Sequence, residues 1–212
     1  MAPDSAPPPE PDDRGSGRAT AGADYAERLR RLEGARWKQV LDVQRPYRWN
    51  LERLDLGRCL DIGCGIGRNL ANLGPGSVGV DHNADAIAVC RERGLTAYTT
   101  EELAGREDLP RGGFDSLLLA HVLEHVDEPT GDGILEEYLP YLRDQGRVVV
   151  ITPQEVGFRS DATHVRWVDH AQAAGHGHRL GLVLERAYSF PFPRLAGRWF
   201  AYNEFVTVLR RP

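Results

Sequence analysis

Cysteine is scarce in this sequence of 212 residues. The three cysteines, Cys59, Cys64 and Cys90, are an odd number, and no two of them form the C-x-x-C pair that is typical of zinc sites and redox dithiols. A disulfide framework is therefore excluded as the basis of the fold. The composition is typical of a protein in a reducing compartment, and we expect a cytoplasmic location.

The sequence also lacks long apolar runs and an excess of basic residues. No segment is long and apolar enough to span a bilayer, and the first residues have neither the basic start nor the apolar stretch of a signal peptide. The net charge of −5 gives no general attraction to phosphate backbones. We therefore expect neither a membrane nor a nucleic acid as partner, although a homodimer stays open.

The composition changes along the chain and divides it into three parts. Residues 1–22 are rich in Pro, Ala, Asp and Gly, lack aromatic residues, and are predicted to form a disordered tail. Residues 23–57 carry apolar positions at helical spacing, interrupted at Pro46, and are predicted to form a helical lid over the site. Residues 58–212 have the length of one α/β domain.

Short apolar runs alternate with helical segments in the middle of the chain. The expected strands are 58–62, 77–80, 96–99, 114–120 and 147–151, and the expected helices are 68–73, 84–93, a short one near Glu101, and 134–142. This alternation is typical of parallel strands joined by helices. Two later β-rich runs, 182–190 and 205–209, have no convincing helix between them. We therefore predict a Rossmann-like, doubly wound α/β fold with seven strands, mostly parallel with an antiparallel C-terminal pair and preceded by N-terminal helices.

A glycine-rich turn follows the first expected strand, in the sequence Asp61-Ile62-Gly63-Cys64-Gly65-Ile66-Gly67. Glycines permit positive φ angles and let a ligand lie against the backbone. A dinucleotide-binding turn would have its third glycine at position 68, which is Arg68, so NAD is disfavoured. The carboxylate of Asp61 suits the ammonium or sulfonium end of S-adenosylmethionine.

A second acid, Asp81, closes the next expected strand and is followed by His82. A carboxylate there can accept hydrogen bonds from both ribose hydroxyls. With this acid, the glycine turn, Phe114-Asp115 and the segment 123–126, residues 58–151 resemble the class I S-adenosylmethionine-dependent methyltransferases. The resemblance implies cofactor-binding roles for Asp61, Gly63, Cys64, Gly65, Gly67, Asp81, His82, Thr100, Glu101, Glu102 and Ala120. It places the adenine near 100–102 and the sulfonium near Ala120.

Histidine and glutamate gather after the fourth expected strand. A helical turn would bring His121, Glu124 and His125 to one side, and His164 follows the fifth strand at the same rim. These four residues are candidate ligands for a divalent ion, with Mg²⁺ favoured and Mn²⁺ or Zn²⁺ open. Without a metal, the alternative is that His121, His125 or His164 acts as a general base, or that Glu124 and His125 only bond the backbone.

The cluster is similar to that of two metal-dependent methyltransferase groups, those of ubiquinone biosynthesis and those acting on the terminal ribose of small RNAs. In these groups the first ligand is usually glutamate, where this sequence has His121. The resemblance implies metal-assisted methylation of a hydroxyl, and a similarity to actinobacterial enzymes favours a sugar or oligosaccharide. The alternatives are a metal-free methyltransferase for a carboxylate or amine, an RNA ribose methyltransferase, or a nucleotide-binding module without catalysis.

Overall fold

The structure, a computed structural model, describes residues 45–212. The predicted tail, 1–22, and the first part of the predicted lid lie outside the described residues. The second lid helix is present as α3 (Arg45–Leu54). Among the described residues, no helix combines the length and the apolar character needed to cross a membrane.

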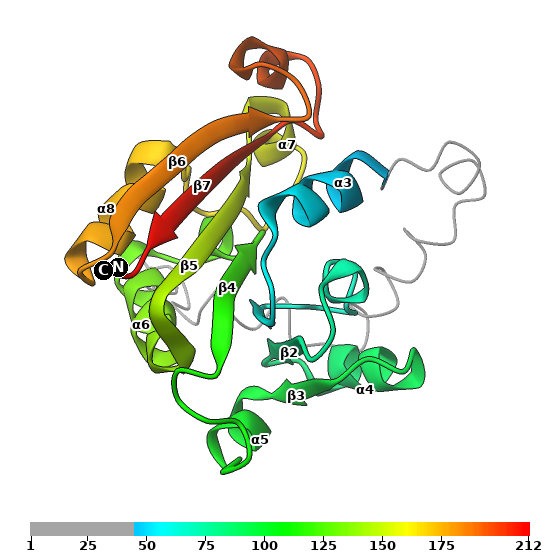
Figure 1. Ribbon diagram of the computed structural model, residues 1–212. Helices are drawn as coiled ribbons and strands as arrows, with labels where there is room; N and C mark the ends of the chain where they lie inside the picture. Colours follow the sequence, from blue (N-terminus) through cyan, green and yellow to red (C-terminus); the bar gives the residue numbers. More distant parts are fainter. Residues whose placement is uncertain (1–44) are drawn as a thin grey trace, which may run out of the picture.

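Seven strands form a single sheet in the order β3-β2-β1-β4-β5-β7-β6 (Figure 1). The strands are β1 (Cys59–Ile62), β2 (Val78–Asp81), β3 (Ala97–Thr99), β4 (Phe114–Ala120), β5 (Leu142–Pro153), β6 (Val183–Phe190) and β7 (Glu204–Arg210). The first five pair in parallel, whereas β7 runs antiparallel to both β5 and β6. The predicted fold class, including the antiparallel C-terminal pair, is confirmed.

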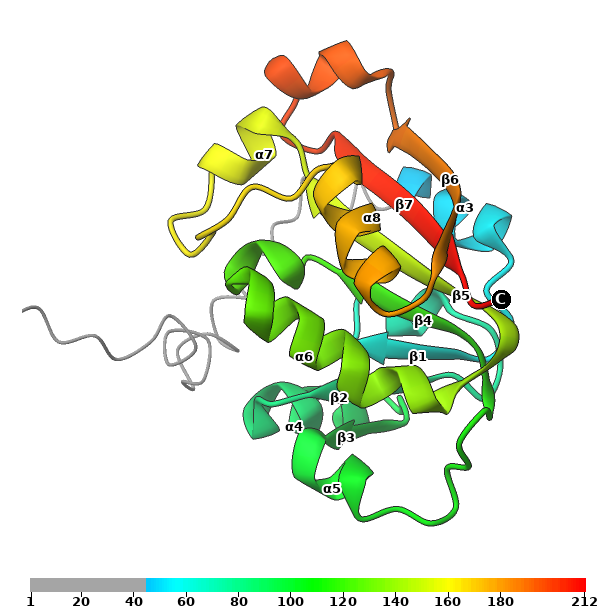
Figure 2. The same ribbon diagram turned by 90° about the vertical axis from the view of Figure 1, so that its left-hand side faces the viewer.

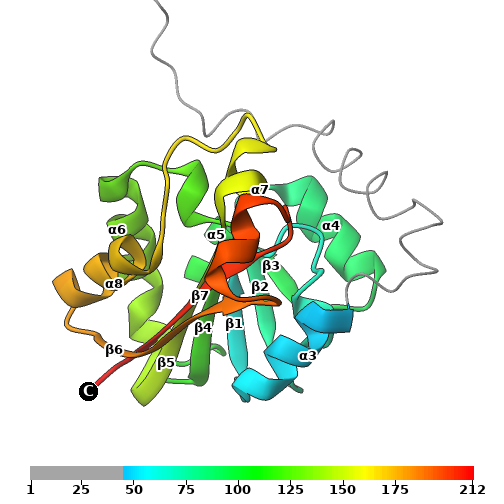
Figure 3. The same ribbon diagram turned by 90° about the horizontal axis from the view of Figure 1, so that it is seen from above.

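Helices cover both faces of the sheet, as Figure 3 shows. On one face, α5 (Thr100–Ala104), α6 (Glu128–Tyr138) and α8 (His170–Arg179) pack on the larger core cluster. On the other face lie α3 and α4 (Ala84–Glu92). Because both faces are covered, the central strands are apolar on both sides, and six of the seven residues of β4 are buried.

The helices differ from the expected pattern in several places. The segment 68–73 forms only the 3₁₀ turn η2 (Leu70–Asn72), which lies between Gly67 at φ +79° and Gly74-Pro75. Helix α6 begins six residues earlier than expected, because Asp127 caps it through the N–H of Thr130. Helix α8 is not among the helices expected from the sequence. It begins at a capping box formed by Asp169 and Gln172.

The functional residues gather at the edge of the sheet where the parallel strands end. Strand β7 runs the other way, so its first residue, Glu204, lies at this same edge opposite Pro153 of β5. The short helix α7 (Glu155–Arg159) and the 3₁₀ turn η5 (Arg194–Arg198) lie together beyond the edge (Figure 2). Segments far apart in sequence therefore surround one region.

Candidate active site

A cavity of about 400 Å³ opens at this edge of the sheet. It extends from the glycine turn to the first residue of β7. Its lining includes Tyr47, Asn50, Gly63, Cys64, Gly65, Ile66, Ala120, His121, His125, Asp161, His164, Tyr202 and Glu204. Of the residues predicted for the cofactor, Gly63, Cys64, Gly65 and Ala120 therefore line the same space as His121, His125 and His164.

The glycine turn is shaped by its own backbone and by close packing. Gly63, Gly65 and Gly67 all have positive φ, at 70°, 52° and 79°. A Cβ on Gly63 would lie 2.6 Å from the Cγ2 of Val122, so only glycine fits there. Gly67 does not line the cavity but packs closely against Leu95, and it therefore contributes to the turn without facing the cavity.

Two buried carboxylates flank the glycine turn. Asp81 accepts hydrogen bonds from the N–H groups of Gly65 (2.8 Å) and Asn83 (2.9 Å), so it fixes the turn to the start of α4. Asp61 is 1% exposed, and its Oδ2 atom has no hydrogen-bond partner among the described residues. Burial and the negative charge of Asp81 raise the pKa of Asp61 to about 8, against a hydrogen bond from the backbone of Leu70. An unpaired buried carboxylate of this kind fits a cationic ligand group.

The residues predicted to bind the adenine, and His82, lie outside the cavity lining. Thr100, Glu101 and Glu102 form the first turn of α5, directly after β3, and the Glu102 side chain completes a capping box with Thr99 while pairing with Arg91. His82 is exposed and lies 3.4 Å from Asp81. These four residues, like Asp61 and Asp81, are not among the cavity lining, so their contact with the cofactor stays a prediction.

His121 lies between two buried glutamates. Its Nδ1 is 3.0 Å from Oε1 of Glu124 and its Nε2 is 2.8 Å from Oε1 of Glu204. Loss of hydration opposes a charge on this ring, yet the two carboxylates hold the pKa of His121 well above its ordinary value. Both ring nitrogens are engaged by carboxylates, so this arrangement leaves His121 no free lone pair for a metal ion.

The other three predicted ligands come together. One ligand atom from each of Glu124, His125 and His164 lies within 4.8 Å of the other two. The side chain of Glu124 is fully buried, and its Oε2 atom has no partner among the described residues. The Nδ1 atoms of His125 and His164 face the backbone oxygens of Thr163 (3.2 Å) and Phe158 (2.7 Å). This leaves Nε2 of each ring for a ligand, the usual arrangement of metal-binding histidines.

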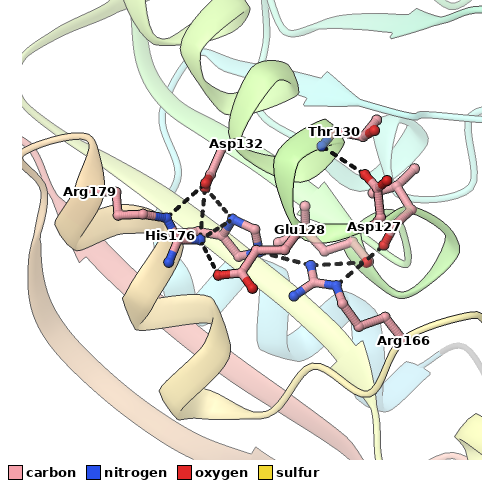
Figure 4. A network of polar contacts seen from close by, with 9 residues as sticks. Asp127, Glu128, Thr130, Asp132, Arg166, His176 and Arg179 are labelled. Atoms are coloured by element: carbon pink, nitrogen blue, oxygen red, sulfur yellow. Dashed lines mark hydrogen bonds and ion pairs between the residues drawn. The ribbon is translucent and has the colours of Figure 1, made fainter.

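A polar network behind the cluster joins the two segments that carry it. Arg166 donates hydrogen bonds to the carbonyl oxygens of Leu123 (3.4 Å) and Val126 (3.3 Å), which flank Glu124 and His125. It also donates to Nε2 of the buried His176 (2.8 Å), whose Nδ1 faces Asp132. Figure 4 shows Arg166 and Arg179 on opposite sides of His176. Arg166 thus ties the turn η3 (Leu123–His125) to the loop that carries His164.

Glu204 and Asp161 line the cavity although the sequence does not predict them there. Glu204 lies 83 positions from His121, and no local motif surrounds it. Glu204 lies at the rim because β7 runs antiparallel to β5 and pairs with it in this register. The sequence predicts the antiparallel direction but not the register. Asp161 faces the cavity from the loop after α7 and bonds the N–H of Thr163 (3.0 Å).

Comparison with known proteins identifies the family. The sequence profile of a family described as a methyltransferase domain matches residues 25–182. The chain belongs to this methyltransferase family. The expected class I S-adenosylmethionine-dependent methyltransferase is thereby confirmed. The cavity beside the glycine turn is its candidate active site.

One group of curated relatives matches part of the methyltransferase. Ubiquinone biosynthesis O-methyltransferases from three strains of Xanthomonas oryzae pv. oryzae are each 31% identical over 113 residues, which make up 47% of this chain and 45% of the relative. The match therefore covers less than half the length of these relatives.

Solved structures of methyltransferases share the fold at low sequence identity. A SAM-dependent methyltransferase from Archaeoglobus fulgidus has a TM-score of 0.61 at 18% identity, covering 82% of this chain and 99% of its own. The magnesium protoporphyrin IX methyltransferase from Synechocystis, with bound SAM, has a TM-score of 0.64 at 14% identity, covering 96% of this chain and 100% of its own. At these identities the likeness concerns the fold alone.

Proposed function

We propose that this methyltransferase methylates a hydroxyl group of a sugar or oligosaccharide, and that a divalent cation held by Glu124, His125 and His164 assists the reaction. The observation that carries this proposal is the unpartnered Oε2 of Glu124 beside two imidazoles whose Nδ1 atoms are already committed to backbone oxygens. A buried carboxylate oxygen without a donor is costly, and a cation would remove that cost.

The donor set also bears on the identity of the cation. Two imidazole nitrogens and one carboxylate oxygen suit Mn²⁺ or Zn²⁺, whereas Mg²⁺ prefers oxygen ligands. From the sequence, the candidate ligands were His121, Glu124, His125 and His164, with Mg²⁺ favoured and Mn²⁺ or Zn²⁺ open. With His121 held between two glutamates, we propose a set of three protein ligands.

The chain's own residues would position the reactants. Gly63, Gly65 and Ala120 line the cavity together with His125 and His164, so an acceptor oxygen near the histidines can lie in line with the methyl group of the cofactor. A cation held there would lower the pKa of the acceptor hydroxyl, which is otherwise a poor nucleophile at neutral pH. As the bond between oxygen and the methyl carbon forms, the bond from carbon to sulfur breaks, its electron pair stays on sulfur, and the hydroxyl proton passes to solvent water.

A hydroxyl acceptor is also supported by the curated relatives, which are named as O-methyltransferases. The part of the chain that matches them is too short to carry over their substrate. A vicinal diol, such as a sugar or a catechol, is favoured because a cation that binds the attacking oxygen can also bind the neighbouring hydroxyl. Among these acceptors, the similarity to actinobacterial enzymes favours a sugar. Methylation of a carboxylate or amine, without metal, is the alternative that the following experiment separates.

The metal content of the purified methyltransferase should be measured by mass spectrometry, and methyl transfer assayed with sugars, catechols, small carboxylates and amines, each with and without a chelator. We expect bound Mn²⁺ or Zn²⁺ and chelator-sensitive methylation of sugars. The substitutions Glu124→Gln and His164→Ala should abolish metal occupancy while the affinity for S-adenosylhomocysteine changes only a few fold. The exposed His178 supplies the matched control His178→Ala.

Two results would contradict the proposal. Unchanged metal occupancy in both site variants would show that the cation binds elsewhere. Chelator-resistant methylation of a carboxylate or amine, with no sugar methylated, would favour the metal-free alternative.

A further inference from the structure

Three buried carboxylate oxygens at the active site lack a hydrogen-bond partner among the described residues. They are Oδ2 of Asp61, Oε2 of Glu124 and Oε2 of Glu204. The first suits the cationic end of the cofactor and the second suits the proposed cation. The third has no assigned ligand, although a buried carboxylate oxygen without a hydrogen bond destabilises a protein.

The surroundings of Glu204 hold its side chain in place. Its Oε1 atom accepts a hydrogen bond from His121 (2.8 Å), and its side chain is 8% exposed. Its backbone oxygen accepts a hydrogen bond from Gln154 (3.0 Å), which also accepts one from Asn203 (2.9 Å). Gln154 and Asn203 are both fully buried, so the start of β7 is fixed on both sides of the carboxylate.

Glu204 also faces the space in which the acceptor has to bind. It lines the same cavity as the glycine turn, Ala120, Tyr47 and Tyr202. The hydroxyl of Tyr47 is already committed to the backbone oxygen of Tyr202 (2.5 Å). The unpartnered oxygen of Glu204 is therefore left for a donor from the ligand.

We infer that Glu204 is an acceptor-binding residue, and that the acceptor carries a hydrogen-bond donor, such as a second hydroxyl, in addition to the hydroxyl that is methylated. This inference rests on the proposed hydroxyl methylation, but it does not depend on the metal. An ionised carboxylate only accepts hydrogen bonds, so an ether, an ester or a hydrocarbon at this position leaves Oε2 unpaired. The favoured substrates are thus polyhydroxyl compounds, and monohydric alcohols are selected against.

The test compares acceptors that differ by one hydroxyl. Methyl α-D-mannopyranoside, methyl α-D-glucopyranoside and their monodeoxy analogues serve as probes, with kcat and KM measured for the wild type and for Glu204→Gln. In the wild type, removing the hydroxyl that Glu204 binds should lower kcat/KM by about 10- to 100-fold, mainly through KM. In Glu204→Gln the same deoxy analogue should cost less than about threefold, because the charged partner is already absent.

Controls separate binding from folding. Glu185 on β6, which pairs with Arg210 at 2.6 Å, gives the matched substitution Glu185→Gln and should keep the wild-type preference. Affinity for S-adenosylhomocysteine should stay within about twofold in Glu204→Gln. If that variant fails to fold, Glu204→Asp keeps the charge but withdraws the oxygen, and it should show the same loss of preference.

An equal deoxy penalty in the wild type and in the Glu204 variants would overturn the inference and leave hydroxyl methylation standing. A wild-type enzyme that methylates monohydric alcohols as well as polyols would also overturn it. If the wild type methylates a carboxylate or amine and no hydroxyl compound, the proposed function fails and the inference fails with it.

Discussion

Replacing Asp61 by asparagine should stabilise the ligand-free enzyme at pH 8 and weaken cofactor binding at the same time. The Asp61 carboxyl is 1% exposed, with one oxygen unpartnered, so its negative charge has little compensation. Asparagine has nearly the same shape, carries no charge and still offers an oxygen to the backbone N–H of Leu70. The substitution therefore removes the charge and leaves the packing in place.

The size of this stability difference, and the pH range in which it appears, follow from the pKa of Asp61. Burial and the charge of Asp81 raise this pKa from 3.8 to about 8. Well below pH 3.8 the carboxyl is protonated in both the folded and the unfolded state, so it does not change the free energy of unfolding. As the pH rises towards 8, only the unfolded state releases its proton freely, so folding becomes less favourable by an amount that reaches roughly 5 kcal/mol. For a domain of this size, the unfolding temperature of the wild type should fall by roughly 10 to 20 °C relative to Asp61→Asn.

Thermal unfolding between pH 5 and pH 8.5, with and without S-adenosylhomocysteine, measures this difference. The affinity of the wild type for S-adenosylhomocysteine should increase with pH up to about 8, since ionised Asp61 attracts the ligand's ammonium group, and Asp61→Asn should lose this dependence. Asp144, whose side chain is 90% exposed, gives the control Asp144→Asn. Parallel unfolding curves for the wild type and Asp61→Asn across this range would refute the reasoning.

Three further substitutions test the packing around the site. Gly63→Ala introduces a Cβ at φ +70° against a neighbouring valine and should lower the free energy of unfolding by about 1–3 kcal/mol and weaken S-adenosylhomocysteine binding, both measurable by denaturant titration and calorimetry. In Arg166→Lys the single ammonium group cannot reach all three partners of Arg166, so the affinity of the proposed cation site should fall about 10- to 100-fold. Equilibrium dialysis measures this affinity, and Arg179→Lys serves as control. Ser116→Ala removes a buried hydrogen bond to a backbone carbonyl and should cost about 1–2 kcal/mol in denaturant titration without changing cofactor affinity.

The sheet could be predicted because its strands are short, apolar and buried on both faces. The segment 114–120, for example, was expected as a strand and forms β4 with the same bounds. The glycine turn was recognisable because its conformation depends on local φ angles. Helix ends were harder to predict, since α6 begins at Glu128, where Gly131 and Gly133 weaken the helical pattern and the cap from Asp127 decides the start.

The active site was only partly predictable, because local spacing says nothing about contacts between distant segments. The spacing of His121, Glu124 and His125 indicated that their side chains converge, but it could not show that His121 turns towards Glu204. The backbone of His121 lies at φ +60°, a conformation that histidine adopts more readily than most residues and that no sequence pattern announces. Glu204 and Arg166 depend on strand register and loop packing across the whole domain.

The terminal hairpin of β6 and β7 has a consequence for how such an enzyme can diversify. The family profile ends at residue 182, ahead of both strands, whereas Tyr202 and Glu204 of the cavity wall come after it. With Glu204 in its proposed role, part of acceptor recognition resides in a stretch of polypeptide separate from the glycine turn, on the same sheet. Exchange of the turn between the two last strands would change that part and leave the glycine turn as it is.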